Sequence, residues 1–399
     1  MSWPMVEIGS VVSALSGFAW KSSNYTSMKK DAMPIIRIQN VGEYNTPQDF
    51  VYWDEQYDNK YVVSSGDILV SLSGNIKVGI WEEPDALLNQ RIVKLIPGDK
   101  IDKDYLYYSV LKNLNDISNL GKKAVISNVS VNDLKKIVIP LPPLPVQRKI
   151  SMNFKKTDLL KRQSEKMSSE LNALAQAVYE FNVGISAKEN SNWSSYTISD
   201  LCDTSKSSMR TGPFGSDLKH SEFVSSGVAV IGIDNAVSNE FRWVERRFIT
   251  KQKYEKLKRY TVHPHDVIIT IMGTTGRVAV IPADIPLAIS TKHLAVLTLD
   301  KNKANPHFIA DTLKWNSHVI EQIKRSNKGA IMDGLNLGTI KSLAVVLPPK
   351  EIQDEYVLKA KAIQDRIAET KELSLSLELQ FNALMQRAFS GKLNPKKVA

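Results

Sequence analysis

One seven-residue motif occurs twice in this chain, and its repetition constrains the fold more than any other feature. The two copies are Leu141-Pro-Pro-Leu-Pro-Val-Gln147 and Leu347-Pro-Pro-Lys-Glu-Ile-Gln353. Each copy follows a β-rich run and precedes a long helical pattern, which ends in Asn172-Ala-Leu-Ala-Gln176 in the first half and in Asn382-Ala-Leu-Met-Gln386 in the second. The same features in the same order indicate an internal duplication.

Two further pairs of segments precede the motif. Trp3 stands near the start of the first half, and Trp193 stands at the corresponding place in the second. Farther on, Gly66-Asp-Ile-Leu-Val-Ser-Leu-Ser-Gly-Asn75 matches His265-Asp-Val-Ile-Ile-Thr-Ile-Met-Gly-Thr274. The offset between the copies grows from about 190 to about 210 residues, so we expect loop insertions in the second copy.

The matched segments contain one predicted buried strand in each half. Ile68–Leu72 and Val267–Ile271 are rich in β-branched residues and end near Gly74 and Gly273, a pattern typical of a strand that enters a turn. The Pro-Pro pair of the motif excludes helix at the residue before each ring, because the ring clashes with the preceding backbone. We therefore expect an extended arm between each globular domain and the helix that follows it.

After each arm the apolar residues recur with a period of about 3.5, which is typical of a coiled-coil helix. The expected seam is Leu160, Ser164, Met167, Leu171, Leu174, Val178 and Phe181 in the first helix, and Thr370, Ser374, Leu377, Phe381, Leu384 and Ala388 in the second. A helical segment of roughly 35 to 40 residues is about 55 Å long. The simplest partner for one helix is the other; the alternative is that each helix docks only on its own domain.

These features predict an α+β fold class. Two mixed α/β domains in a pseudo-twofold repeat would be separated by two long antiparallel helices that form a coiled-coil pair. The expected boundaries are residues 1–143 and 191–349 for the domains, and residues 144–190 and 350–399 for the helical segments, with Gly184 and Gly391 as helix C-caps. A length of 399 residues with 43% hydrophobic residues supports at least two domains.

The single cysteine, Cys202, excludes an intramolecular disulfide and a zinc site built on a cysteine pair. A buried, inert thiol is the default interpretation, and it suits a reducing compartment. The N-terminal residues lack the pattern of a secretory signal, and no apolar run approaches the roughly 20 residues that span a bilayer. We therefore expect a cytoplasmic protein.

The motifs of several enzyme classes are missing from the sequence. It contains no phosphate-binding G-x-x-x-x-G-K-[ST] loop, no G-x-G-x-x-G before a helix, no H-E-x-x-H and no amino-methyltransferase tetrapeptide. Gly273-Thr-Thr-Gly276 fits a structural turn better than a phosphate loop. His263 and His265 lack neighbours with ligand spacing, so we expect surface or turn histidines and no metal site. The sequence therefore predicts neither ATP hydrolysis nor methyl transfer by this chain alone.

The charge of the chain favours a polyanionic partner. The formal net charge is +10 with a pI near 9.3, and lysine and arginine displace counterions from phosphates. The charge is uneven, because residues 191–349 sum to about +6 whereas residues 1–140 sum to about −1. We expect the second domain to supply more of the attraction to phosphate.

The densest basic stretch lies in the second domain, where arginines alternate with Trp243 and Phe248. A loop that starts at Arg210 and ends at Lys219 carries Gly212 and Gly215, which let backbone approach a phosphate closely. A solvated amphipathic segment and a plain structural loop are the alternatives. The candidate DNA-binding residues of this domain are Arg210, Lys219, Arg242, Arg246, Arg247, Arg277, Lys292, His293 and Lys328.

The first domain contributes a second set of candidates. Asparagine and glutamine side chains can read adenine and arginine can read guanine, whereas lysines set affinity and register. The residues are Lys21, Lys29, Lys30, Asn75, Lys77, Gln90, Arg91, Lys122 and Lys123.

With these residues assembled, the chain resembles the specificity subunit of type I restriction-modification systems. The resemblance covers the whole length: a domain, the Leu-Pro-Pro arm and a helix, then the same again, ending in Gln386-Arg-Ala-Phe-Ser-Gly-Lys-Leu393. The segment Gly212-Pro-Phe-Gly-Ser216 is also similar to segments of the family's target-recognition domains. The second arm departs from the first, since Lys350-Glu351 replaces Leu144-Pro145.

The resemblance implies a function that composition and spacing alone do not give. Two target-recognition domains would bind the halves of a bipartite double-stranded DNA site, and the paired helices would bridge the gap. Two methyltransferase subunits and, in the full complex, two restriction subunits would be recruited. S-adenosylmethionine, ATP and Mg²⁺ would belong to those partners, with no cofactor in this chain. The alternative from another class is a helical-spacer scaffold that binds other proteins and not DNA.

Overall fold

The structure is a computed structural model of the chain, and it describes residues 3–27, 31–42, 49–74, 76–120, 129–185, 193–205, 207–244, 246–326 and 335–389. The chain divides into two compact units. The first comprises Met1–Glu165 with Lys371–Ala399, and the second comprises Lys166–Thr370. Each unit contains one globular domain and a part of each of two long helices, α3 (Leu144–Tyr179) and α9 (Lys350–Phe389).

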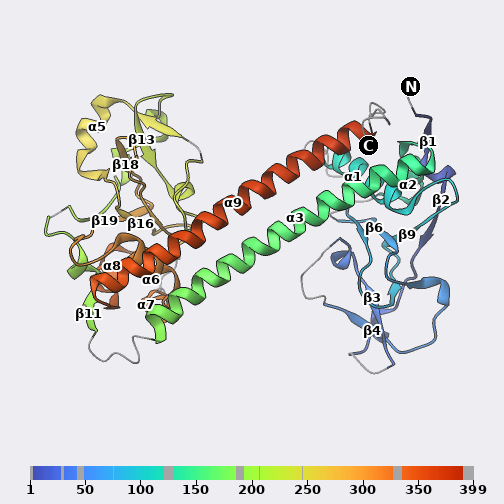
Figure 1. The fold of residues 1–399 in the computed structure, drawn as a ribbon, viewed down its shortest axis with the longest axis horizontal. Helices are drawn as coiled ribbons and strands as arrows, with labels where there is room; N and C mark the ends of the chain where they lie inside the picture. The colour runs from blue at the N-terminus through green and yellow to red at the C-terminus, as the bar shows by residue number, and fades with distance from the viewer. Residues whose placement is uncertain are drawn as a thin grey trace. The chain divides into compact units, whose positions relative to one another are not determined.

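The domain of the first unit contains three small sheets. The strands are β1 (Met5–Glu7), β2 (Val12–Ser16), β3 (Met33–Ile36), β4 (Val51–Trp53), β5 (Val62–Val63), β6 (Ile68–Ser71), β7 (Val78–Ile80), β8 (Ala86–Leu88), β9 (Ile92–Pro97) and β10 (Val138–Pro140). The sheet orders are β2-β9-β6-β7, β4-β3-β8-β5 and β1-β10. Helices α1 (Lys103–Leu120) and α2 (Val131–Lys135) complete the domain (Figure 1).

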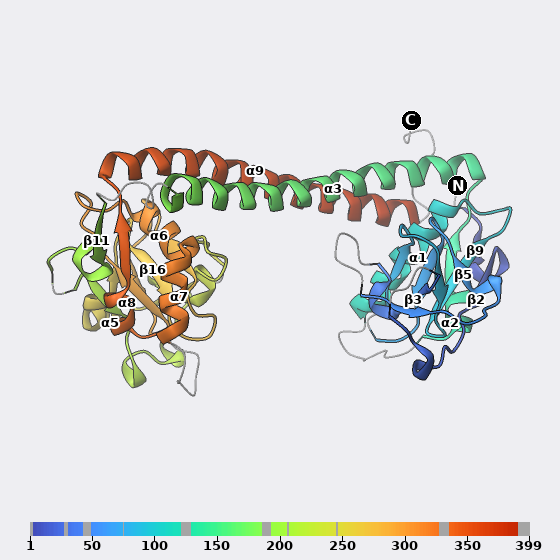
Figure 2. The same cartoon turned by 90° about the horizontal axis from the view of Figure 1, so that it is seen from below.

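The domain of the second unit repeats this plan. Its strands are β11 (Ser194–Thr197), β12 (Met209–Thr211), β13 (Val228–Ile231), β14 (Arg247–Ile249), β15 (Thr261–Val262), β16 (Val267–Thr270), β17 (Val278–Val280), β18 (Ala288–Ser290), β19 (Leu294–Leu297) and β20 (Ala344–Leu347). Its helices are α5 (Lys251–Leu257), α6 (Pro306–Trp315), α7 (Ser317–Ser326) and α8 (Leu337–Ser342), visible in Figure 2 around β16. The sheet orders are β12-β19-β16-β17, β14-β13-β18-β15 and β11-β20.

The two domains therefore share one topology, which confirms the duplication. In each, one four-stranded sheet contains a single parallel pair, β3 with β8 in the first domain and β13 with β18 in the second. The predicted buried strands are β6 and β16, and every residue of both is buried. Each leads to a glycine with the same left-handed backbone, because Gly74 and Gly273 both have φ of +72°.

A glutamine clasp joins each arm to its domain. The proline pairs of the arms lie in neither helix nor strand, and α3 and α9 begin directly after the second proline of each pair. Gln147 Oε1 accepts a hydrogen bond from the backbone N–H of Asp102 at 2.8 Å, and its Nε2 donates to the carbonyl oxygens of Lys100 and Pro142 at 3.0 and 2.7 Å. Both oxygen and nitrogen of this buried amide are thus used to hold the start of α3.

The second copy of the motif makes the same clasp. Gln353 Oε1 accepts from the backbone N–H of Asn305 at 2.9 Å, and its Nε2 donates to the carbonyl oxygens of Lys303 and Pro348 at 3.1 and 2.9 Å. Both glutamines are 0% exposed. The last residue of the repeated sequence motif therefore has one structural role, performed twice.

The two long helices run antiparallel. In the first unit the beginning of α3 packs on the end of α9, since the ring of Phe154 lies 5.7 Å from that of Phe381 and 5.9 Å from that of Phe389. In the second unit the end of α3 packs on the beginning of α9, with the rings of Tyr179 and Tyr356 5.7 Å apart. These contacts confirm the antiparallel helix pair.

The same helices also dock on the domains. Phe154 packs against Tyr108 of α1 in the first unit, and Tyr356 packs against Phe308 of α6 in the second. Pairing between helices and docking on a domain, which the sequence presented as alternatives, therefore occur together. No helix in the described part of the chain combines the length and apolarity of a bilayer-spanning segment.

The predicted seam is right for α9 and half wrong for α3. In α9, Thr370, Leu377 and Ala388 are buried, and Ser374, Phe381 and Leu384 are partly buried. In α3, Ser164, Leu171 and Val178 face inward, but the other predicted seam residues are exposed: Leu160 by 42%, Met167 by 44%, Leu174 by 48% and Phe181 by 69%.

The buried positions of α3 lie one residue farther along the chain. Ala175 is 2% exposed, and Lys161, Ser168 and Asn182 are partly buried. A single neighbouring helix covers only a narrow stripe of α3, which includes Ser164, Leu171 and Val178. Of the two rows of residues that flank this stripe, the predicted row and the row one residue farther along, only one can also be covered. The row of small and polar residues is covered, and Lys161 pairs with Glu378 of α9 at 4.0 Å. Gly184 is no C-cap, because it lies in a π-helical turn (Glu180–Ile185) that continues α3, whereas Gly391 lies outside the described residues.

An acid lies beside the two tyrosines that join the helices in the second unit. The hydroxyl of Tyr356 donates to Asp311 Oδ2 at 2.8 Å. Burial raises the pKa of the Asp311 carboxyl to about 6, although the bond from Tyr356 opposes the shift. Burial also raises the pKa of Tyr179 to about 12. The fold therefore favours the neutral form of Asp311.

We predict that Gln353→Leu lowers the free energy of unfolding by about 2 to 4 kcal/mol, because it leaves buried backbone groups of the clasp without partners. The measurement is chemical denaturation of the purified chain. Gln386→Leu replaces an exposed glutamine of the same helix and is expected to change stability little. Equal effects of the two substitutions would contradict the clasp.

We predict that Asp311→Asn raises the melting temperature above pH 6 and has little effect near pH 4. A carboxyl group with a raised pKa in the folded state contributes its full stability below the ordinary value of about 3.9, and loses it as the pH rises to about 6. Thermal melting across this range is the measurement, with the exposed Asp365→Asn as control. A gain that is constant with pH would rule out this account.

Candidate nucleic-acid interface

The second domain has a polar pocket at the carboxyl ends of its two parallel strands. Gly232, Ile233 and Asp234 follow β13, and Thr291, Lys292 and His293 follow β18. Arg247, the first residue of β14, forms another wall. We call this the β13–β18 pocket; it has a volume of about 340 Å³, and its remaining lining residues are Pro213, Gly215, Leu218, His220 and Phe223.

Two glycines lie at close approaches beside the pocket. A Cβ atom on Gly212 would lie 2.2 Å from the backbone carbon of Thr291, so the segment that begins at Gly212 can approach the end of β18 only with glycine there. A Cβ atom on Gly232 would lie 2.7 Å from Nη2 of Arg247, so a side chain there would displace the end of that arginine. The sequence suggested that Gly212 lets backbone approach a phosphate. In the structure, this glycine is required by the close approach of two backbone segments inside the domain.

An ion pair lies in the pocket wall, where Arg247 Nη2 donates to Asp234 Oδ1. The two side chains are 25% and 31% exposed. Four buried polar atoms in and beside the wall have no hydrogen-bond partner within the described chain: Asp234 Oδ2, Arg247 Nε, Ser290 Oγ and Thr291 Oγ1. Unsatisfied buried groups of this kind are costly and rare in folded proteins, so this cluster marks the pocket wall as a place where the described chain leaves hydrogen-bonding capacity unused.

The pocket is electropositive. Burial lowers the pKa of His293, and the positive charges of Lys292 and Arg247 lower it further. His293 is therefore favoured in its neutral form, in which one ring nitrogen donates and the other accepts a hydrogen bond. The pocket thus combines cationic groups with a neutral ring that can do both.

We call the two turns that follow the parallel strands of each domain its corner; the turns follow β3 and β8 in the first domain and β13 and β18 in the second. The corner of the first domain carries different side chains. Arg37 follows β3, and Nη2 of its guanidinium donates to the carbonyl oxygen and to Oδ2 of Asp49 at 2.7 and 3.0 Å. Asn89, Gln90 and Arg91 follow β8. A Cβ atom on Gly17 would lie 2.2 Å from the carbonyl oxygen of Asn89, which repeats the close approach of Gly212.

One asparagine fixes the turn after the first parallel strand in each domain. The backbone N–H of Arg37 donates to Asn40 Oδ1 at 2.8 Å, and that of Gly232 donates to Asn235 Oδ1 at 2.9 Å. Both asparagines are buried, at 4% and 0% exposure. The frame of the corner is thus conserved between the copies, while the polar side chains that it displays differ.

Several of the predicted DNA-binding residues gather here. The β13–β18 pocket brings together Arg247, Lys292 and His293, and the exposed Lys219 precedes its lining residue His220. In the first domain the corner contains the exposed Gln90 and Arg91. The set outside both corners comprises Lys21 and Lys77 in the first domain and Arg242, Arg246 and Arg277 in the second.

The outer arginines of the second domain are exposed but engaged. Arg242 pairs with Glu240 at 2.7 Å, and Arg246 lies 5.4 Å from the ring centroid of Trp243. The sequence suggested that an aromatic ring supports an arginine in this stretch, and Trp243 does so for Arg246. Lys29, Lys30, Asn75, Lys122, Lys123 and Lys328 lie outside the described residues.

Arg210 was wrongly predicted to face DNA. Its side chain is 9% exposed and forms an ion pair with Asp266 at 2.6 Å. It also donates to the carbonyl oxygens of Thr261 and Ser207 and to Thr298 Oγ1. The residue lies in β12, and the acid that neutralises it is 56 positions away in the sequence, so no local pattern reveals the pair.

Sequence reasoning also missed Arg37, Asp49 and Asp234. A signal for the turns was present, because Pro34-Ile-Ile-Arg-Ile-Gln-Asn40 matches Ala229-Val-Ile-Gly-Ile-Asp-Asn235. This pair of segments, used as a further repeat, would have placed both turns at equivalent positions of the two domains.

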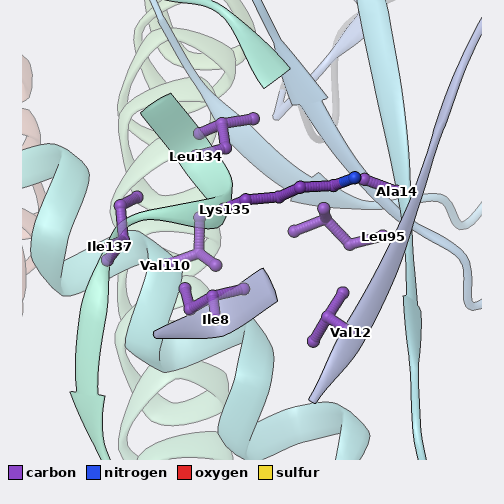
Figure 3. A pocket seen from close by; sticks show the side chains of 8 residues that line it. All are labelled: Ile8, Val12, Ala14, Leu95, Val110, Leu134, Lys135 and Ile137. Carbon is purple, nitrogen blue, oxygen red and sulfur yellow. The ribbon is translucent and has the colours of Figure 1, made fainter. Parts of the chain in front are cut away.

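A second pocket and the single cysteine, both within the described part of the chain, carry no comparable chemistry. Figure 3 shows a pocket of the first domain that is lined mainly by apolar side chains, including Ile8, Val12 and Leu95, beside the long stem of Lys135. Its volume of about 10 Å³ holds at most one water molecule. Burial raises the pKa of Cys202 to about 12, as expected for an inert thiol. No cluster of metal-ligating side chains occurs among the residues that the structure describes.

Comparison with known proteins gives a consistent assignment. The model of the type I restriction modification DNA specificity domain matches residues 2–173 and 190–379. The specificity subunit of the Escherichia coli type I restriction enzyme EcoBI is 26% identical over 427 residues, which cover 98% of this chain and 86% of that protein. The putative MjaX specificity subunit of Methanocaldococcus jannaschii is 24% identical, with coverage of 92% and 88%.

A solved structure supports the fold. The crystal structure of the type I restriction-modification system S subunit from M. genitalium has a TM-score of 0.61 and 15% identity, and the match covers 97% of this chain and 96% of that one. The family model matches nearly all of both halves, including the repeated arms and most of both long helices. This chain therefore belongs to the family of specificity subunits of type I restriction-modification systems.

Proposed function

We propose that this chain is the non-catalytic DNA-recognition subunit of a type I restriction-modification complex in a prokaryotic cytoplasm. Each target-recognition domain binds one half of a bipartite double-stranded DNA site. The observation that carries the proposal is that the corners of both domains share one backbone conformation but have different polar side chains. Two similar domains with different polar side chains can bind two half-sites that differ in base sequence.

Charge supports DNA as the ligand. The second domain carries the surplus of positive charge, and its pocket contains Arg247, Lys292 and His293. Arginine binds phosphate oxygens or guanine through paired donors, and neutral histidine both donates and accepts hydrogen bonds. The scaffold alternative, a helical spacer that binds only proteins, gives no reason for such a pocket.

Two methyltransferase subunits, and in the full complex two restriction subunits, are the proposed protein partners. S-adenosylmethionine, ATP and Mg²⁺ are assigned to them and not to this chain. Support for a protein contact comes from exposed apolar residues in the second unit, because Met167 and Leu174 lie seven residues apart on one face of α3 and the exposed Phe181 follows in the π-helical turn. Exposed apolar rows of this kind mark protein interaction sites.

We predict that the complex with its cognate DNA weakens steeply with salt, with the logarithm of the binding constant falling about 0.9 for each neutralised phosphate per tenfold rise in salt. The measurement is fluorescence anisotropy at several salt concentrations, with a duplex that carries the bipartite site found by mapping methylated adenines in the host genome. Salt-independent binding, or equal affinity for a random duplex, would favour the scaffold.

We predict that Leu174→Asp and Leu377→Asp have opposite profiles. Leu377 is 7% exposed, so a charge there costs several kcal/mol and lowers the melting temperature. Leu174 is 48% exposed, so a charge there leaves the melting temperature nearly unchanged but reduces co-purification of the methyltransferase subunit. Normal co-purification of the Leu174→Asp chain would refute the proposed docking row.

A further inference from the structure

The second domain contains two arginine–aspartate pairs with different surroundings. Arg210 and Asp266 are 9% and 1% exposed, and Arg210 also donates to three further oxygen atoms of the protein. Asp266 in turn accepts from the backbone N–H of His263 and from Thr298 Oγ1. This pair has its hydrogen-bonding capacity used inside the protein, as expected of a structural ion pair.

The pair in the β13–β18 pocket lacks such partners. Arg247 and Asp234 share one hydrogen bond, and both are partly exposed at the pocket wall. Arg247 Nε and Asp234 Oδ2 have no partner within the described chain. These two atoms are themselves buried, although each side chain is partly exposed to the pocket. The pair therefore has an unused donor and an unused acceptor, which a ligand with acceptors next to a donor would complement.

A G·C base pair offers this pattern in the major groove. Guanine presents two adjacent acceptors, O6 and N7, to which arginine donates in paired fashion, and cytosine presents the N4 amino group, from which a carboxylate accepts. An A·T pair has one acceptor fewer at the purine and a methyl group at the pyrimidine. A phosphate group has acceptors only and would repel Asp234, so a phosphate does not explain the carboxylate.

We infer that Arg247 and Asp234 together read one G·C base pair in the half-site bound by the second domain, Arg247 donating to guanine and Asp234 accepting from cytosine. The inference rests on the proposed function and adds the contact residues and the base pair. Lys292, beside the pair, would hold the nearby phosphate backbone and carry no choice of base.

The first domain provides an independent comparison. It also has an arginine–aspartate pair at this corner, but the order is reversed: Arg37 follows the parallel strand and Asp49 precedes β4, whereas Asp234 follows β13 and Arg247 begins β14. The two pairs occupy different positions of the shared frame, because Arg37 aligns with Gly232 and Gln39 aligns with Asp234. Each copy therefore brings an arginine and an aspartate together at this corner with its own residues.

The test is to express the chain with the methyltransferase subunit of its own system in cells that lack adenine methylation, and to map methylated adenines in the genome. The wild-type chain is expected to give one bipartite motif with G·C required at one position of one half. In Arg247→Gln and Asp234→Asn, the preference for G·C at that position is expected to fall by about tenfold or more, with the other half and the gap unchanged.

Arg325→Gln is the matched control. Arg325 also pairs with a carboxylate, Glu321, but it lies in α7, outside the pocket lining, and this variant is expected to keep the wild-type motif at every position. Arg247→Lys guards against a folding defect of the glutamine variant. It keeps the charge but loses the paired donors, so it is expected to relax the same position while the chain melts at the wild-type temperature.

The possible results separate the two levels of the proposal. A wild-type motif that persists unchanged in Arg247→Lys and Asp234→Asn overturns the inference but leaves the proposed function standing. Methylation that falls equally at all sites, without relaxation at one position, assigns the pair to backbone contact and also overturns the inference. Absence of any bipartite motif with the wild-type chain overturns the proposed function itself.

Discussion

The buried amide of Gln147, and its counterpart Gln353, is the interaction on which the arrangement of this chain depends. A helix that leaves a domain through a Pro-Pro arm has no hydrogen-bonded backbone continuity with the sheet behind it. The glutamine replaces that continuity, because its oxygen and nitrogen bind backbone groups of the arm and of the domain loop that precedes α1 or α6. The direction in which each long helix starts is therefore fixed by one side chain.

Much of the fold was predictable from the sequence because the chain repeats itself. The repeated motif, the β-branched runs and the change of period gave the two domains, the strands β6 and β16, and the antiparallel helices. The seam of α3 was not predictable in the same way, since Leu160, Met167, Leu174 and Phe181 satisfy the heptad as well as the buried row does. Size and hydrophobicity favour the wrong row when large apolar residues lie on the exposed side of a helix.

The candidate site was predictable only in part. Arg247, Lys292 and His293 were identified by residue type, but their meeting in one pocket depends on the parallel pairing of β13 with β18, which joins segments about 60 residues apart. Arg210 and Arg247 look alike in the sequence. They differ in the aspartate that pairs with each of them. Asp266 is buried beside Arg210, whereas Asp234 is partly exposed at the pocket wall beside Arg247.

The frame of the corner has a consequence for how such a chain changes over time. Its shape is set by groups that do not face the pocket: Asn40 and Asn235, which tie the turns, and Gly17 and Gly212, which admit a neighbouring backbone. The displayed side chains therefore carry little of the folding free energy. Mutations at these positions are tolerated by the fold, so new ligand preferences can arise by single steps without a loss of stability that would first need repair.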